Sequence, residues 1–252
     1  MKISVIICTR NRPKLLMSRS LPSVLSQTFK DFEVIVIDDC SDEPYFNGIS
    51  GSVILGKIRY HRNTERKGLA YGRNLGVRMA KGDYIVSLDD DNLFEPQFLE
   101  KTVAYLDSHP VDAVGVRKVI VYPEGKCSML PKLPCSLNDG FVFRKEVFEK
   151  IRCDEELHAN EDADLGIQFF KAGLKMGLID EPLMTVYGSP IFNTTSYSDY
   201  SDRHLDGLAK FWLKNHDYKQ YIGRMFLLSS GHWFRYFYWI EQKLKRWYQI
   251  YL

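Results

Sequence analysis

Two short, almost uninterrupted apolar runs restrict the fold of this chain more than any other feature. They occupy residues 3–8 and 34–37 and are rich in Val and Ile, which favours strands. An apolar run without regular polar alternation indicates a strand that is buried on both faces. Residues 14–27 lie between the runs, so the pattern predicts a parallel βαβ unit with both faces of its sheet covered.

The segment between these strands has the apolar spacing of a helix. Its apolar side chains recur at the i, i+4, i+7 and i+8 positions of one helix face, which Met17, Leu21, Val24 and Leu25 occupy. Pro22 lies inside this pattern, and proline lacks the N–H that an interior helix position donates. We therefore expect Pro22 to kink or divide the helix.

The rest of the chain continues the alternation of strands and helices. Further strands are predicted at 57–61, 84–88, 113–121, 141–143, 178–179 and 184–187, and helices at 68–80, 95–106, 144–151 and from about 160 to Gly173. The chain has 252 residues, of which 45% are hydrophobic, which is ample for a sizeable core. The prediction is an α/β protein: one domain with an appendage, or two small domains.

Composition excludes several classes of protein. The net charge is +2, from 34 basic and 32 acidic residues, so no overall field favours nucleic acid. The five cysteines form no CxxC pair, which is typical of reduced thiols in a cytoplasmic compartment. Neither a signal peptide nor an apolar run of about 18 residues is recognisable, so we expect a soluble protein.

The strand at 84–88 runs directly into three carboxylates, Asp89, Asp90 and Asp91. Repulsion among them is offset by a divalent cation, by hydrogen bonds or by exposure to water. Taken alone, such a run is more often a solvated turn than a site.

Other charged residues also follow strands. Residues 9–12 come after the first strand and Asp38 and Asp39 after the second. Because ligands of open parallel sheets bind beyond the carboxyl ends of the strands, these groups should meet at one edge with the acidic run. Together with Arg10, Arg12 and Arg73, the carboxylates suit a metal-bound diphosphate.

Small residues recur at every fourth position of the helix at 68–80, namely Gly68, Gly72, Gly76 and Ala80. Each interior glycine costs about 1 kcal/mol relative to alanine. The stripe indicates close approach either to the sheet or to a ligand, and the pattern alone does not separate these two.

With these segments in this order, the chain resembles the inverting glycosyltransferases of family 2, which have the GT-A fold. The resemblance rests on residues 5–13, 23–28, 33–42, 68–76, 82–91 and 160–165, and it covers about residues 2–187. It implies a Rossmann-like, mostly parallel sheet flanked by helices. Residues 1–190 would form the catalytic domain, with nucleotide-sugar binding in about 1–92 and the acceptor side in about 93–190. Residues 191–252 would form a helical C-terminal extension.

The resemblance also implies a donor site. Thr9 and Arg12 would flank the base and ribose, Asp39 would accept a hydrogen bond from either, and Arg73 and the backbone at Gly68 would lie by the nucleotide or diphosphate. Residues 136–140 would line the donor-sugar side.

The acidic run would be the family's DxD-type motif, with Mn²⁺ or Mg²⁺ on the donor diphosphate. It can be matched as Asp89-x-Asp91 or as Asp90–Asp91, and Asp91 is a metal ligand in both registers. Some relatives add a late histidine ligand, but none follows Tyr187 in the expected place. We interpret His158, His204 and His216 as surface or packing residues.

Glu161 and Asp162 match the family's ED pair, in which Asp162 would be the general base. Acids in a first helical turn also complement the helix dipole without any catalytic role. The implied reaction moves a sugar from a nucleoside-diphosphate sugar, with UDP favoured by family frequency, to a hydroxyl of a glycan or lipid-linked acceptor. A nucleotidyltransferase and a non-catalytic nucleotide-sugar-binding protein are the alternatives.

The tail contains two further patterns. Residues 242–247 have one residue too many for the Gln-x-x-Arg-Trp motif of processive synthases, so we expect single-sugar transfer. Residues 233–251 carry an aromatic helical stripe with basic residues largely off it. This pattern fits an interfacial membrane helix or a helix packed on the domain or on a second subunit. The expected location is cytoplasmic, with peripheral contact at the inner face of the membrane left open.

Overall fold

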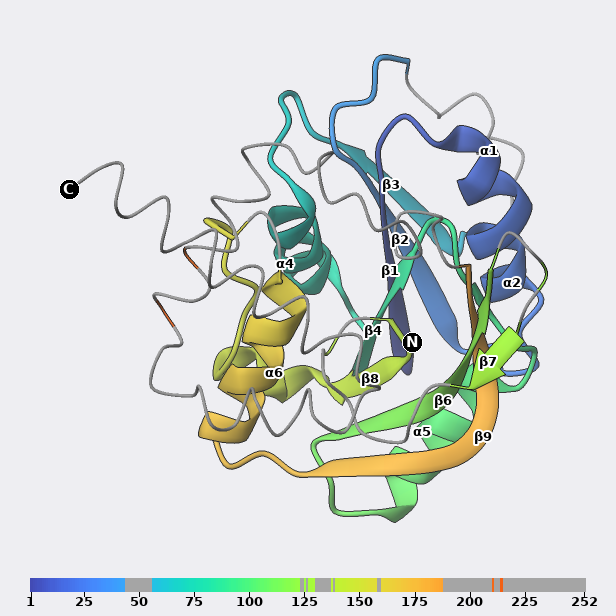
Figure 1. Ribbon diagram of the computed structural model, residues 1–252, viewed down its shortest axis with the longest axis vertical. Helices are drawn as coiled ribbons and strands as arrows, with labels where there is room; N and C mark the ends of the chain where they lie inside the picture. Colours follow the sequence, from blue (N-terminus) through green and yellow to red (C-terminus); the bar gives the residue numbers. More distant parts are fainter. Residues whose placement is uncertain are drawn as a thin grey trace.

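A single sheet with helices on both faces forms the part of the chain that the structure describes (Figure 1). The structure is a computed structural model. It describes residues 1–43, 56–122, 125, 127–129, 137, 139–157, 160–187, 210 and 214.

The first half of the chain builds the parallel side of this sheet. Its strands are β1 (Ile3–Thr9), β2 (Phe32–Asp38), β3 (Ile58–Arg62) and β4 (Tyr84–Asp89). They lie in the order β3-β2-β1-β4, and each neighbouring pair is parallel. The predicted parallel βαβ unit is confirmed.

Burial on both faces explains the continuous apolar runs. Ile3, Val5 and Ile7 pack on one face with Leu16, Leu21 and Val24 of the first helical segment. On the other face, Ile6 packs with Ile35, Ile37 and residues of α4 (Leu69–Met79). Because successive strand residues point to opposite faces, every position needs an apolar side chain.

The helix after β1 is divided, as the position of Pro22 predicts. It runs as α1 (Pro13–Leu15), a π-helical turn η1 (Leu16–Ser20) and α2 (Leu21–Leu25). The N–H of Leu21 donates to the carbonyl of Leu16, which is the spacing of a π-helix. Pro22 follows in the first turn of α2, where its missing N–H costs little.

The second half of the chain makes the whole sheet mixed. It adds β5 (Leu93–Phe94), β6 (Ala113–Val121), β7 (Cys127–Met129), β8 (Phe141–Arg144) and β9 (Met176–Tyr187). The order continues from β4 as β8-β6-β9-β5, with β7 beside β6. β8 is antiparallel to β4 and β6, whereas β9 is parallel to β6. The α/β class is therefore confirmed, with the parallel pairing concentrated in the first half.

The two short strands predicted at 178–179 and 184–187 are one strand, β9. Pro182 lies opposite Arg117, where the pairing with β6 shifts register. Proline is tolerated in a strand at such an irregularity, and the strand therefore continues through it.

The helices of the second half cover both faces. The helix α5 (Phe98–Ser108) packs with the first helical segment, and α6 (Glu161–Lys171) packs over β8 with a short 3₁₀ turn, η3 (Lys145–Glu149). α5 begins two residues after Pro96 rather than at it. Gly173 has a φ of 68° and follows the end of α6, as the sequence predicts.

The small-residue stripe of α4 is a contact with the sheet. A Cβ on Gly76 would come within 2.4 Å of Ile6 Cγ2, and one on Gly72 within 2.9 Å of Cys8 Sγ. Gly68 differs, because it has a φ of 95° and lies just before the helix. The stripe thus brings α4 close to β1.

Several predictions fall beyond the described residues. Of the predicted extension at 191–252, only residues 210 and 214 are described, and both are helical. The tail at 233–251 and all three late histidines lie outside the described part, so the division at residue 190 and the two interpretations of the tail stay predictions. Within the described residues, no helix is both long and apolar enough to cross a membrane.

Candidate active site

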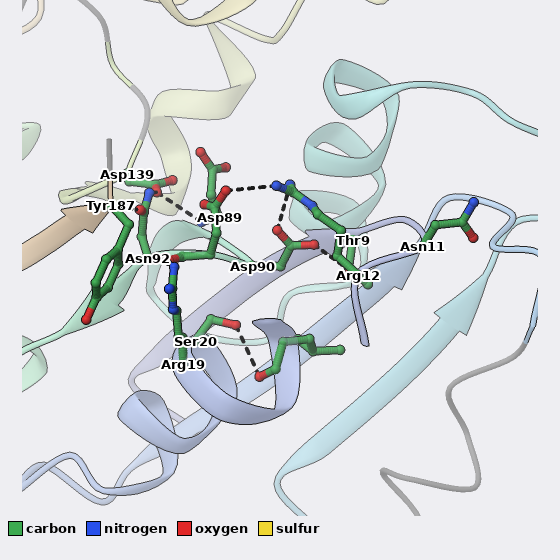
Figure 2. Close-up of polar contacts among 12 residues, drawn as sticks. Thr9, Asn11, Arg12, Arg19, Ser20, Asp89, Asp90, Asn92, Asp139 and Tyr187 are labelled. Carbon is green, nitrogen blue, oxygen red and sulfur yellow. Dashed lines mark hydrogen bonds and ion pairs between the residues drawn. The ribbon is translucent and has the colours of Figure 1, made fainter. Parts of the chain in front are cut away.

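The carboxyl ends of β1 and β4 meet at one edge of the sheet, as predicted. The hydroxyl of Thr9 donates to Asp90 Oδ2 at 2.6 Å, although 81 residues separate them. The Arg12 guanidinium contacts Asp90 Oδ1 at 2.6 Å and Asp91 Oδ2 at 2.8 Å. Figure 2 shows Thr9 and Arg12 both reaching the Asp90 carboxylate, with dashed lines at their contacts. The acidic run is therefore paired with the predicted donor-side residues.

Asp90 is the buried member of the run. Its side chain is fully enclosed, and this burial raises its pKa to about 6, although Thr9 and Arg12 act in the opposite direction. Its neighbours differ, since the side chains of Asp89 and Asp91 are 32% and 30% exposed. The outer two aspartates therefore remain accessible to a ligand.

Asp39 lies at the end of β2 and organises the loop before α4. Its Oδ1 accepts from Asn63 Nδ2 at 2.9 Å and from the N–H of Lys67 at 2.8 Å, and its Oδ2 accepts from the N–H of Gly68 at 2.9 Å. The structure thus brings Asp39 and Gly68 into direct contact. In this conformation the Asp39 carboxylate already has three donors.

Arg73 connects the two acidic motifs. It projects from α4, is 6% exposed, and contacts Asp89 Oδ1 at 3.1 Å and Glu161 Oε1 at 2.9 Å. Burial acts to lower the pKa of Arg73, but the two carboxylates hold it well above its ordinary value. For Glu161 the balance differs, because burial raises its pKa even though the Arg73 guanidinium acts to lower it. The predicted ED pair and the acidic run therefore belong to one site.

Asp162 is the second residue of α6 and follows Glu161, the acid of this ion pair. The N–H of Ala163 donates to its Oδ1 at 2.8 Å, and its side chain is partly exposed. The preceding Asn160 has a left-handed backbone, with a φ of 60°. After this bend Glu161 contacts Arg73, and Asp162 keeps access to solvent.

Sequence reasoning missed Asp139 and Asn92. Asp139 is 1% exposed, and its Oδ2 accepts from the Asp89 N–H at 3.0 Å and from Asn92 Nδ2 at 2.7 Å. Burial raises the pKa of Asp139 to about 8. An Asp-Gly pair before an apolar strand has the pattern of a solvated turn, so only its general location, in the segment predicted to line the sugar, was accessible from the sequence.

Lys118 on β6 is a second group that the sequence analysis missed. Burial lowers its pKa, and the carboxylates of Asp139, Asp162 and Asp89 act in the opposite direction. The Lys118 amino group therefore lies among the acidic groups of the site. In the sequence it stands within a strand and has no distinguishing pattern.

The acidic run has the donor chemistry of a shared metal site. Mg²⁺ and related cations use one or two carboxylates together with substrate phosphate oxygens, and Asp89 and Asp91 offer partly exposed carboxylates. Among the described residues, no group of three or more acidic, His or Cys side chains is placed to hold a metal ion. The residues thus fit a cation shared with a substrate phosphate, and the metal ligands stay a prediction.

Comparisons with known proteins identify the family of this chain. The family model "Glycosyl transferase family 2" matches residues 4–155. An uncharacterized glycosyltransferase of Haemophilus influenzae is 33% identical over 161 residues, covering 63% of this chain and 49% of the relative. The poly(ribitol-phosphate) beta-N-acetylglucosaminyltransferase TarP of Staphylococcus aureus is 36% identical over 137 residues, covering 52% and 40%. The chain thus spans less than half of the length of these two relatives.

A solved structure supports the fold. The crystal structure of S. aureus TarS residues 1–349 in complex with UDP-GlcNAc superposes with a TM-score of 0.68 at 19% identity, covering 85% of this chain and 66% of that one. At this identity the match concerns the fold alone. With a family model that matches more than half of the chain, this protein belongs to glycosyl transferase family 2 and has the GT-A fold.

Proposed function

We propose that this protein is an inverting glycosyltransferase that moves a sugar from a nucleoside-diphosphate sugar to a hydroxyl of a glycan or lipid-linked acceptor. The observation that carries this proposal is the ion pair of Arg73 with both Asp89 and Glu161. It joins the acidic run, where the diphosphate would lie, to the helix end that carries Asp162. Donor and acceptor would therefore meet in one place.

Each residue has a part in this reaction. Thr9 and Arg12 would bind the donor, and Asp89 and Asp91 would hold Mn²⁺ or Mg²⁺. The bound cation would offset charge on the departing diphosphate. Asp162 would take the proton of the acceptor hydroxyl as its oxygen attacks the anomeric carbon from the face opposite the leaving group. UDP is the favoured nucleotide, which the UDP-GlcNAc bound to TarS supports.

Two other functions would leave different products. A nucleotidyltransferase would release pyrophosphate, whereas a glycosyltransferase releases a nucleoside diphosphate. A non-catalytic nucleotide-sugar-binding protein would release neither. The partly exposed Asp162 beside the Arg73 ion pair favours transfer, since a pure binding site does not need a base.

The test replaces Asp162 by asparagine. We expect donor affinity, measured by isothermal titration calorimetry with Mn²⁺ and a UDP-sugar, to stay within about threefold, while transfer falls by about 10²–10⁴-fold. Glu156→Gln is the matched control, because Glu156 is an exposed acid near the same helix. Transfer by Asp162→Asn at the wild-type rate would show that the base is another residue.

The setting of the enzyme is part of the same proposal. We expect single-sugar transfer during polysaccharide biosynthesis at the cytoplasmic side of a membrane. Residues 233–251 would contact either the lipid surface or a second subunit, and deletion of this tail followed by liposome flotation separates the two.

A further inference from the structure

Asp139 is a buried carboxylate that the proposed chemistry does not use. It lies just before β8, and its Oδ2 receives both of its hydrogen bonds, from the Asp89 N–H and from Asn92 Nδ2. Its Oδ1 is buried without a hydrogen-bond partner among the described residues. Burial of a carboxylate oxygen without a partner is costly, so the two hydrogen bonds that Asp139 accepts indicate a positional task for this side chain.

Leu137, two residues earlier, is tied to the other side of the site. Its N–H donates to the carbonyl oxygen of Asp162 at 3.1 Å. Its side chain is 3% exposed, and its Cγ lies 3.6 Å from where a Cβ on Gly166 of α6 would stand. Leu137 thus fixes this segment to the first turns of α6.

The residue that follows Asp139 has a left-handed backbone that favours glycine. Gly140 has a φ of 80°, and a Cβ there would come within 2.9 Å of Met184 Sδ and 3.0 Å of Lys118 Cε. Asp139 is therefore followed by a position that only glycine occupies without strain.

The Asn92–Asp139 hydrogen bond also connects the acidic run to Tyr187 and Arg19. Asn92, which donates to Asp139, accepts from the N–H of Tyr187 at 3.1 Å through its Oδ1. The Tyr187 ring in turn stacks on the Arg19 guanidinium at 3.8 Å, and Arg19 donates to the carbonyl oxygen of Asp91 at 3.2 Å. Figure 2 shows Asp139, Asn92 and Tyr187 grouped on one side of Asp89, with Asp90 and Arg12 on the other.

We propose that Asp139 is a positioning residue that, together with Leu137, sets the separation between the acidic run and Asp162. This inference rests on the proposed function, in which residues 89–91 carry the metal and Asp162 is the base. An in-line displacement needs both at a fixed distance, because a misplacement of about 1 Å can cost about 100-fold in rate. The neutral amide of asparagine retains an oxygen that can accept both hydrogen bonds, so geometry rather than charge is the property at stake.

The test compares Asp139→Ala and Asp139→Asn with variants of Glu33. Glu33 is 1% exposed and accepts from the Lys81 N–H at 2.6 Å and from Ser4 Oγ at 2.7 Å. It is therefore also a buried carboxylate that accepts from a backbone N–H, but it lies near the amino end of β2, away from the strand ends that form the site. Glu33→Ala and Glu33→Gln measure what the loss of such a group does away from the site.

Two readouts are needed besides thermal stability. Free Mn²⁺ is counted by electron paramagnetic resonance during titration in the presence of UDP, and kcat and KM are measured for sugar transfer. Loss of a residue that orients metal ligands typically costs about 10–100-fold in metal affinity or activity. We expect losses of that size for Asp139→Ala, recovery to within about fivefold for Asp139→Asn, and wild-type values for both Glu33 variants at a comparable loss of stability.

Several results would overturn this inference. Asp139→Ala with wild-type Mn²⁺ affinity and kcat would do so, and so would Asp139→Asn that is as impaired as Asp139→Ala. If Asp139→Ala does not fold, the asparagine variant still decides through its metal titration. A wild-type chain that binds Mn²⁺ with UDP but transfers no sugar would contradict the proposed function. The Mn²⁺ titrations of the Asp139 variants would still test whether Asp139 positions the acidic run. Absence of Mn²⁺ binding by the wild type would defeat the positioning role.

Discussion

Buried acidic residues of this chain differ in how their charge is compensated, and Glu33 is a well-compensated one. Burial acts to raise its pKa, but hydrogen bonds from the Lys81 N–H, Ser4 and Arg59 outweigh burial and lower it below its ordinary value of 4.5. The folded state therefore binds fewer protons than the unfolded state in mildly acidic solution. Glu33 thus stabilises the fold above its unfolded pKa, and this contribution is lost as pH falls.

Replacement of Glu33 by glutamine should therefore have a pH-dependent effect. We expect Glu33→Gln to lower the free energy of unfolding by about 1.5–3 kcal/mol at pH 7, the usual range for hydrogen bonds to a charged group. The difference from wild type should shrink as pH falls below about 4.5. Urea denaturation from pH 3 to pH 7 measures this difference, and a difference that stays constant over this range would show that folding does not lower the pKa of Glu33.

Among the secondary-structure elements, the contact of α4 with β1 is the tightest constraint on the site. Gly76 faces Ile6 of β1 with no room for a methyl group, and Arg73 lies one helical turn earlier on α4. The position of the Arg73 ion pair therefore depends on how closely the helix approaches the strand.

Gly76→Ala should push the helix outward. Alanine favours a helix by about 1 kcal/mol, but overpacking costs about 1–3 kcal/mol, so we expect a net loss of stability together with a loss of activity. Ile6→Ala removes all three side-chain atoms that the new methyl group would meet. Chemical denaturation of the double mutant should show a smaller loss than the sum of the single mutants. Simple additivity would show that the two residues do not compete for space.

At the same scale, the sequence predicted elements whose signals are local. The strands at 84–88 and 113–121 were found because their apolar runs are bounded by turn residues, and the division at Pro22 follows from the chemistry of proline. The continuity of β9 through Pro182 was missed, because it depends on a register shift against β6. The sequence of β9 alone does not show where its pairing with β6 shifts register.

For the whole molecule, the edge of the sheet where β1, β2 and β4 end is the expected ligand site. A ligand that binds only the folded state stabilises it by about 2.7 kcal/mol at a hundred times its Kd. We expect UDP with Mn²⁺ to raise the melting temperature more than UDP with a chelator, and more than GDP or dTDP with Mn²⁺.

Asp91→Asn should remove most of the manganese-dependent part of this increase, whereas the exposed Glu156→Gln should not. A thermal-shift panel of the three nucleotides, each with and without Mn²⁺, provides the measurement. Equal stabilisation by UDP with and without Mn²⁺ would contradict a metal shared between the acidic run and the diphosphate.

Residue pairings across the molecule mark the limit of what the sequence could predict. Thr9, Arg12 and residues 89–91 were placed together correctly, because parallel strands bring their carboxyl ends to one edge. The pairing of Arg73 with both Asp89 and Glu161 was not predicted, since it depends on how α6 lies against α4. Asp139 was missed because its burial is a tertiary property of an Asp-Gly pair that is ordinary in sequence.

The Arg73 ion pair also bears on how such chains can be recombined. Residues up to Asn92 provide one of its carboxylates and the guanidinium, while Glu161 comes from the other half of the chain. Consider a chimera that joins the first half of this chain to the second half of a relative. It would keep the buried Arg73 and Asp89, but the relative's half would not necessarily supply an acid in place of Glu161. We therefore expect a chimera with an exchanged second half to keep this ion pair only when the second parent supplies an acid at the position of Glu161.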